Sequence, residues 1–312
     1  MLPKRYRLEN FNKAIRNPRV VLGELSKLAI ALNTHYYRHR HADGIDVLER
    51  DWDNLVILDG CRADTFREVS TPEGKLQTVR SGGSESWEFM RHNFLGRALH
   101  DTVYVTANPY ATKLPAGTFH AVENLIESDW DPDLRTVPPR PVTQAAIDAA
   151  AAYPDKRLIV HYMQPHYPFI GPAGQRIEHG GFGPDRDDET DSGGHVWTQL
   201  QYGLLEEAPV RAAYRENLEI VLKDVTTLLN TLDGKSVITS DHGNLLGERI
   251  GPIPVKAYGH PPGLYVDELL RVPWLVRDGG RRRTIRSDPP KERTEIGAEV
   301  VSDRLEALGY KP

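Results

Sequence analysis

The chain has 312 residues, 39% hydrophobic and 27% charged, which is a globular composition on a length sufficient for a sizeable core. The formal net charge is only −5, so nothing favours a nucleic-acid surface, and an anionic substrate would need a local positive site. The single cysteine, Cys61, excludes an internal disulfide and fits a reducing compartment. We find neither a signal-peptide pattern nor an apolar run of about eighteen residues, and we therefore expect a cytoplasmic protein.

Residues 1–50 form a predicted basic, helical N-terminal extension. Asn17-Pro18 can open a helix, and helical spacing relates the apolar residues that follow: Val21, Leu25, Leu28 and Leu32. Basic side chains surround its start: Lys4, Arg5, Arg7, Lys13, Arg16 and Arg19. Such a helix either packs on its own domain or lies on an anionic membrane surface, and the sequence leaves both open.

The first predicted strand is the continuous apolar run at residues 54–58, which ends in Asp59-Gly60. A short run without polar alternation is typical of a strand buried on both faces of a parallel sheet. Chemistry in α/β enzymes gathers at the carboxyl ends of such strands, so Asp59 is a candidate metal ligand. An aspartate in this position is also common as a turn residue or a helix cap.

A glycine-rich loop follows at residues 81–86. Gly82 and Gly83 permit close approach of the backbone, and Ser84 is placed to cap a helix whose apolar stripe begins at Trp87. Free amides and a positive dipole at a helix N-terminus favour a phosphate or sulfate group. The simpler alternative is that Ser84 only caps its helix.

The middle of the chain continues the alternation of strands and helices. A strand at 102–107 leads to Asn108, an alanine-rich helix covers 143–153, and a buried strand at 158–160 runs into His161 and His166. We expect both histidines just beyond the strand end. Residues 171–194 are rich in glycine and acidic residues without periodicity, and predict a surface loop or lid.

A long amphipathic helix at 210–232 precedes a β-branched strand that stops at Asp241-His242-Gly243. Aspartate supplies a hard oxygen and histidine an imidazole nitrogen, so the pair suits a divalent cation. The alternative is a polar turn after the strand. His260 follows in a loop, and the chain ends with a strand at 272–276 and a helix around 295–308.

The order of these elements predicts one α/β domain over residues 51–312. Strands and helices alternate without an internal repeat or an obvious linker. This pattern is typical of a doubly wound, mostly parallel central sheet with helices on both faces.

Four separate segments resemble the sulfatase-like members of the alkaline phosphatase superfamily. Residues 55–64, Leu-Val-Ile-Leu-Asp-Gly-Cys-Arg-Ala-Asp, resemble the first strand and its aspartate loop. Ser240-Asp241-His242-Gly243 resembles the late metal-binding strand end. Residues 161–168 and 258–260 are similar to histidine loops of the same group, so the resemblance spans about residues 54–276.

The resemblance implies an alkaline-phosphatase-like fold with one divalent metal ion, Zn, Mn, Mg or Ca, held by Asp59, Asp241 and His242. Ser84 would complete the metal sphere as the nucleophile, because residues 82–89 look like the threonine loop of phosphoglycerol transferases; Ser86 is the alternative. The remaining roles implied are catalysis by His166 and His260 and contact with the substrate by His161, His166, His260 and Asn108.

The function implied is a metal-dependent phosphohydrolase or phosphotransferase. Its substrate would be a phosphate mono- or diester, including one linked to a glycan or a lipid head group. The first alternative is a sulfatase acting on glycan sulfate esters, although neither Cys61 nor Ser84 lies in the Cys/Ser-x-Pro-x-Arg motif that yields formylglycine. The second is a non-catalytic binding protein that retains the fold.

Overall fold

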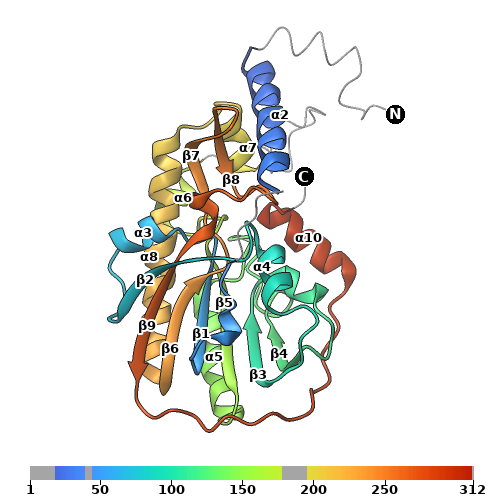
Figure 1. The fold of residues 1–312 in the computed structure, drawn as a ribbon, viewed down its shortest axis with the longest axis vertical. Helices are drawn as coiled ribbons and strands as arrows, with labels where there is room; N and C mark the ends of the chain where they lie inside the picture. The colour runs from blue at the N-terminus through green and yellow to red at the C-terminus, as the bar shows by residue number, and fades with distance from the viewer. Residues whose placement is uncertain (1–17, 39–43, 178–194, 311–312) are drawn as a thin grey trace.

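The structure is a computed structural model that describes residues 18–38, 44–177 and 195–310. The basic residues before Pro18 and most of the predicted lid therefore lie outside the described residues. Within them, the chain folds around one large sheet, with a small two-stranded sheet beyond its carboxyl edge (Figure 1).

The large sheet has seven strands in the order β2-β9-β6-β1-β5-β3-β4. All neighbouring pairs are parallel except those made by β9, which runs opposite to both β2 and β6. The strands are β1 (Asn54–Asp59), β2 (Lys75–Arg80), β3 (Leu99–Thr106), β4 (Phe119–Asn124), β5 (Arg157–Pro165), β6 (Gly234–Ser240) and β9 (Arg271–Gly279). The predicted doubly wound, mostly parallel sheet is confirmed.

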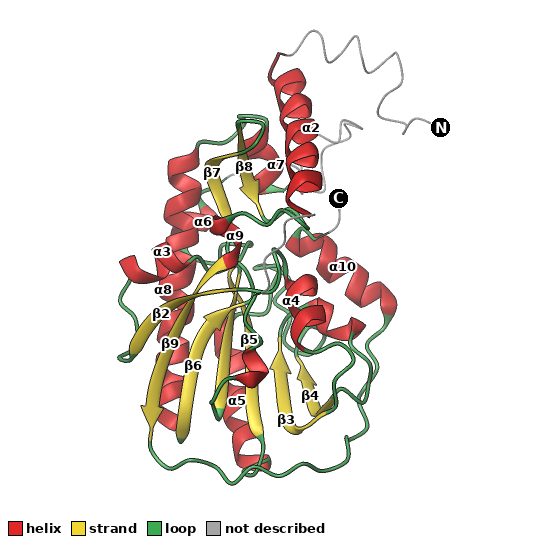
Figure 2. Cartoon of the chain, viewed as in Figure 1, coloured by secondary structure: helices red, strands yellow, loops and turns green. Residues whose placement is uncertain are grey.

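Strand β1 is buried at every position, because helices cover both faces of the sheet. Val56 and Leu58 point into a cluster with the long helices α5 (Pro139–Ala152) and α8 (Glu207–Thr231). Leu55 and Ile57 point the other way, into a cluster with α4 (Ser86–Asn93) and α10 (Ala298–Leu308). Side chains alternate along a strand, so one continuous apolar run supplies both cores. Figure 2 shows the helices arranged around the sheet.

A second layer lies beyond the carboxyl edge of the large sheet (Figure 1). Here α2 (Pro18–Arg38) packs on the hairpin of β7 (Leu245–Ile250) and β8 (Val255–Gly259). The short helices of the fold are η2 (Val47–Glu49), α3 (Ala63–Glu68), η3 (Pro109–Lys113), α6 (Pro172–Gln175), α7 (Val196–Gln201) and α9 (Asp267–Leu270). No helix among the described residues is long and apolar enough to span a bilayer.

Strands β2 and β4 of the large sheet and the β7–β8 hairpin were not predicted from the sequence. Strand β2 is an exposed-to-intermediate edge strand, so its sequence lacks a buried apolar run. Strand β5 is also longer than predicted: it continues from Val160 through His161 to Pro165, and these polar residues are buried within it. His161 therefore lies inside the strand rather than beyond its end.

Candidate metal centre

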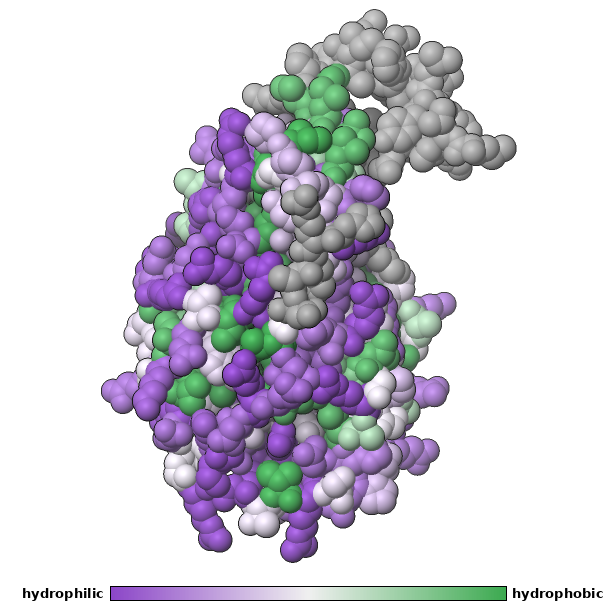
Figure 3. Space-filling view, in the orientation of Figure 1, coloured by the Kyte–Doolittle hydropathy of each residue, from purple (hydrophilic) through white to green (hydrophobic). Residues whose placement is uncertain are grey.

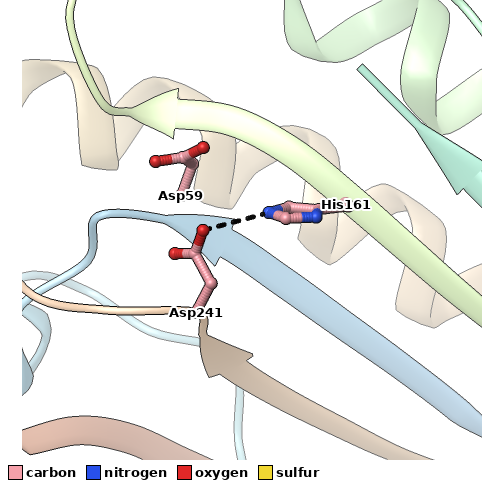
Figure 4. Close-up of side chains that lie close together, drawn as sticks. All are labelled: Asp59, His161 and Asp241. Atoms are coloured by element: carbon pink, nitrogen blue, oxygen red, sulfur yellow. Dashed lines mark ion pairs between the residues drawn. The ribbon is translucent and has the colours of Figure 1, made fainter. Parts of the chain in front are cut away.

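Three neighbouring strands bring Asp59, His161 and Asp241 together at the carboxyl edge of the sheet (Figure 4). Asp59 is the last residue of β1, Asp241 directly follows β6, and His161 lies in β5 opposite Ile57. One ligand atom from each lies within 4.8 Å of the others, and all three side chains are fully buried. The register of β1 and β5 shifts after Leu58, and such irregularities commonly adjust side chains near active sites.

Each of the three side chains keeps one buried atom without a hydrogen bond: Asp59 Oδ1, His161 Nε2 and Asp241 Oδ2. Their other atoms are held. Asp241 Oδ1 accepts hydrogen bonds from the amides of Gly60 (3.0 Å) and His242 (2.8 Å), and His161 Nδ1 pairs with the hydroxyl of Tyr104 (2.9 Å). Leaving buried carboxylate oxygens unpaired is costly, and a cation between them removes that cost. The residues present thus fit a divalent ion.

His242 lies beside this group with its ring fixed by a hydrogen bond from Nδ1 to the carbonyl of Gly243 (2.6 Å). Its Nε2 is 3.5 Å from Asp59 Oδ1 and 3.7 Å from Asp241 Oδ2. Burial alone would lower the pKa of His242, but the carboxylates of Asp241 and Asp59 outweigh it and raise the pKa to about 9. Burial would conversely raise the pKa of Asp241, and the two histidines hold it below its usual range. His242 is placed to act as a fourth ligand.

The two candidate serines lie in different surroundings. Ser86 Oγ is 3.1 Å from Asp59 Oδ2 and 3.4 Å from His242 Nε2. Ser84 Oγ instead binds Glu88 Oε2 (2.8 Å) and accepts from the amide of Gly263 (2.9 Å). Ser86 therefore lies beside the carboxylate of Asp59, whereas Ser84 bonds to Glu88 and Gly263, away from the candidate metal ligands.

The helix start explains this difference. Helix α4 begins at Ser86, and its cap is Glu85, whose carboxylate accepts from the amides of Trp87 and Glu88. The prediction of Ser84 as the cap is wrong, because a glutamate side chain satisfies those amides. Ser86 consequently occupies the first turn, directed toward Asp59.

Asp59 Oδ2 is surrounded by three donors. These are the amide of Asn108 (2.7 Å), the hydroxyl of Tyr310 (2.8 Å) and Ser86 Oγ. Asn108 was expected to contact the substrate; in the structure its amide orients a candidate metal ligand. Tyr310 was not among the residues predicted, and no local sequence signal points to it.

His166 and His260 lie next to the carboxylate group and bond to each other through their Nε2 atoms (2.7 Å). His166 Nδ1 pairs with the carbonyl of Tyr167, and the ring of Tyr310 stacks on that of His166. Burial, reinforced by charge on His242, lowers the pKa of both histidines. Neutral His166 then donates from Nδ1, so His260 carries the proton shared between the two Nε2 atoms.

The loop carrying His166 is held by Asn217 of α8. Its side-chain amide donates to the carbonyls of Pro165 (3.2 Å), His166 (3.0 Å) and Pro168 (3.2 Å), and its oxygen accepts from the amide of Ile170. Asn217 is fully buried. One side chain thus satisfies four backbone groups of an irregular loop.

The residues that follow Asp59 are structural. Gly60 has φ +65°, a conformation favourable only to glycine, and a β-carbon there would lie 3.4 Å from His242 Cε1. The thiol of Cys61 is buried in the apolar cluster with Phe66, and burial raises its pKa well above the ordinary value. The interpretation of Cys61 as a small buried residue therefore agrees with its position.

No protein-family model matches the sequence, and no curated protein matches it. Similar solved structures include the integral membrane protein lipooligosaccharide phosphoethanolamine transferase A from Neisseria meningitidis, 15% identical with a TM-score of 0.47. That match covers 72% of this chain and 46% of the transferase, so the chain spans less than half of it.

Two further solved structures are similar to this chain. The C-terminal periplasmic domain of phosphoethanolamine transferase EptC from Campylobacter jejuni is 14% identical with a TM-score of 0.47, over 72% of this chain and 78% of that one. An alkaline phosphatase superfamily protein from Vibrio parahaemolyticus is 12% identical with a TM-score of 0.38. The match covers 91% of this chain and 75% of that protein. At these values the likeness carries no argument about reaction or substrate.

The expected cytoplasmic location is corrected by the same comparisons, since the domains similar to this chain include periplasmic ones. The expectation rested in part on Cys61, and a chain with one buried cysteine can form no internal disulfide in either compartment. The similar structures do include members of the superfamily that the aspartate and histidine motifs indicate.

Proposed function

We propose that the chain is a metal-dependent phosphohydrolase or phosphotransferase with Ser86 as its nucleophile. The observation that carries this proposal is the close approach of three buried ligand atoms without a hydrogen bond, one each on Asp59, His161 and Asp241. The Ser86 hydroxyl is hydrogen-bonded to the same Asp59 carboxylate. Phosphoryl transfer uses a positioned nucleophile and a cation that stabilises charge on the phosphate oxygens, and this site offers a candidate for each.

A divalent ion would be held by Asp59 Oδ1, His161 Nε2 and Asp241 Oδ2, with His242 Nε2 alongside. When bound, such an ion lowers the pKa of a nearby hydroxyl and stabilises negative charge on phosphate oxygens. Tyr104 supports His161 from behind, as partners of metal-binding histidines usually do. Carboxylate and imidazole ligands together suit zinc or manganese.

The chain's own residues then perform the transfer. Ser86 Oγ forms the new bond to phosphorus, its proton passes along the hydrogen bond to Asp59 Oδ2, and the ester bond to the leaving alcohol breaks. The leaving alkoxide takes a proton from a water molecule, and the hydroxide formed takes the proton held by Asp59. Neutral His260, oriented by His166, is placed to donate a hydrogen bond from Nε2 to a phosphate oxygen. Water or an acceptor alcohol afterwards displaces Ser86 from phosphorus, giving hydrolysis or transfer.

Phosphate esters are favoured over sulfate esters because no residue at the site is suited to conversion into formylglycine. Formylglycine chemistry needs a cysteine or serine converted at the centre, whereas Cys61 is packed among apolar side chains and Ser86 stands without the proline and arginine of the motif. A free hydroxyl nucleophile is suited to phosphorus.

The test is a screen of phosphate monoesters, phosphate diesters and sulfate esters with zinc, manganese, magnesium and calcium. We expect turnover of phosphate esters only with metal, and a loss on the order of a thousandfold or more in Ser86→Ala. Ser84→Ala is the matched control, two residues away on the same loop, and should keep nearly full turnover.

Two results would contradict the proposal. Full turnover by Ser86→Ala with loss in Ser84→Ala would return the nucleophile to Ser84. Absence of bound metal together with no turnover of any ester would indicate a binding protein that retains the fold.

A further inference from the structure

Helix α2 presents an apolar face to solvent. Six of the nine exposed large hydrophobic side chains among the described residues belong to it: Val21, Leu22, Leu25, Leu28, Leu32 and Tyr36. The four leucines are 52% to 63% exposed, and their helical spacing places them on one side. Isolated exposed apolar residues are ordinary, but a continuous stripe marks an interaction surface.

The other side of α2 is already packed against the molecule. Gly23 lies against the ring of Tyr202, and Lys27 donates to the hydroxyl of Tyr202 (2.6 Å). The side chain of Asn33 exchanges hydrogen bonds with the backbone of Ile253 (2.9 Å each), and Ile30 and Tyr37 pack on the apolar cluster of the β7–β8 hairpin. The helix is therefore held in place with its leucines outward.

Two further exposed hydrophobic side chains lie on loops that contact α2. Ile253, on the turn bonded to Asn33, is 38% exposed, and Leu204, two residues after Tyr202, is 49% exposed. The space-filling view shows hydrophobic side chains gathered over α2 at one end of the molecule (Figure 3). This end is the one beyond the carboxyl edge of the sheet (Figure 1).

The segment that precedes α2 in the sequence is basic. The first nineteen residues contain six basic side chains, Lys4, Arg5, Arg7, Lys13, Arg16 and Arg19, and a single acidic one, Glu9. Basic residues beside an apolar stripe complement a surface that is negatively charged outside and apolar beneath. A soluble partner with a matching apolar groove would not require this concentration of charge.

We propose that α2 docks on the surface of an anionic lipid bilayer, lying in its plane with the leucine face buried. The carboxyl end of the helix contacts the loop that follows His260. Arg38 and Thr34 lie against Gly263 of this loop, and the amide of Gly263 donates to Ser84 Oγ. Docking thus places the loop after His260 near the lipid surface. The inference stands whether or not the chain transfers phosphate.

The test is sedimentation of the full chain with vesicles of phosphatidylcholine, with and without phosphatidylglycerol. We expect binding to the anionic vesicles at low salt, at least about tenfold weaker at high salt because exposed charges are screened. Leu25→Glu with Leu28→Glu should abolish binding. The matched control, Leu95→Glu, changes another exposed leucine away from α2 and should bind as the wild type does.

Thermal melting of each variant shows whether it folds; since all three positions are exposed, each should melt near the wild-type temperature. The proposal is overturned if the wild-type protein does not sediment with anionic vesicles. It is equally overturned if the protein dimerises and the Leu25/Leu28 variant is a monomer, because the face would then join two copies of the chain.

Discussion

The hydroxyl of Tyr310 donates to Asp59 Oδ2 across 2.8 Å, although the two residues lie near opposite ends of the sequence. Helix α10 ends at Gly309 in the left-handed conformation (φ +87°), and this turn directs Tyr310 into the site. Burial and the Asp59 carboxylate raise the pKa of Tyr310 well above 10. The hydroxyl therefore stays protonated and acts as a donor that orients Asp59.

Tyr310→Phe should weaken metal affinity and turnover by about tenfold to a hundredfold, the usual effect of losing a partner of a metal ligand. The ring, and with it the stacking on His166, is retained. Calorimetric titration with zinc measures the affinity. Tyr258→Phe is the matched control, since its hydroxyl binds Glu207 on the surface; equal loss in both variants would show that Tyr310 has no special role.

Removing metal should destabilise the protein. At a zinc concentration about a hundredfold above Kd, we expect the melting temperature to rise by about 5 to 10 °C, and chelator to reverse it. Asp241→Asn should abolish the rise, because Asn keeps an oxygen for the amides of Gly60 and His242 but not the charge. Asp129→Asn, on an exposed loop, should leave it intact; an unchanged response in Asp241→Asn would exclude this site.

His161→Gln distinguishes a metal ligand from a substrate contact. His161 Nε2 has no hydrogen bond and lies 3.5 Å from Asp241 Oδ2, so we expect zinc affinity to fall by about tenfold or more, even without substrate. Zinc titration of the variant, compared with KM measured at saturating zinc, separates the two roles. A raised KM with unchanged zinc affinity would support the substrate contact expected from the sequence.

Asn217→Ala should lower the free energy of unfolding by about 2 to 3 kcal/mol, since buried carbonyls of the His166 loop lose their donor. Denaturant unfolding measures the change. Asn230→Ala, on the exposed part of the same helix, should cost less than about 0.5 kcal/mol. Similar losses at both positions would mean that the loop draws its stability from elsewhere.

The candidate ligands Asp59 and Asp241 were predictable because each lies at the end of an apolar run long enough to be recognised as a strand. Parallel strands carry their carboxyl ends to one edge, so the two aspartates had to meet. The sequence prediction put His161 beyond the end of its strand, because the apolar run stops at Val160. In the structure the strand continues to Pro165, and His161 pairs with Ile57 of β1.

The choice between Ser84 and Ser86 depended on one helix boundary. Both serines precede the same apolar stripe, and only the capping contacts of Glu85 decide where the helix begins. Tyr310 could not be predicted, because its role arises from a turn at Gly309 and from packing between distant segments. Predictions of this kind need tertiary contacts that sequence periodicity does not contain.

The three ligand atoms come from strands widely separated along the chain, and this gives a bound cation a second role as a cross-link. It would join β1, β5 and β6 at one point, and the ligand atoms meet there only when these three neighbouring strands have paired. Metal binding would therefore require that the three strands have assembled, and not only that local structure has formed. Slow hydrogen exchange across the central strands should accompany it, since opening any one of them would release the ion.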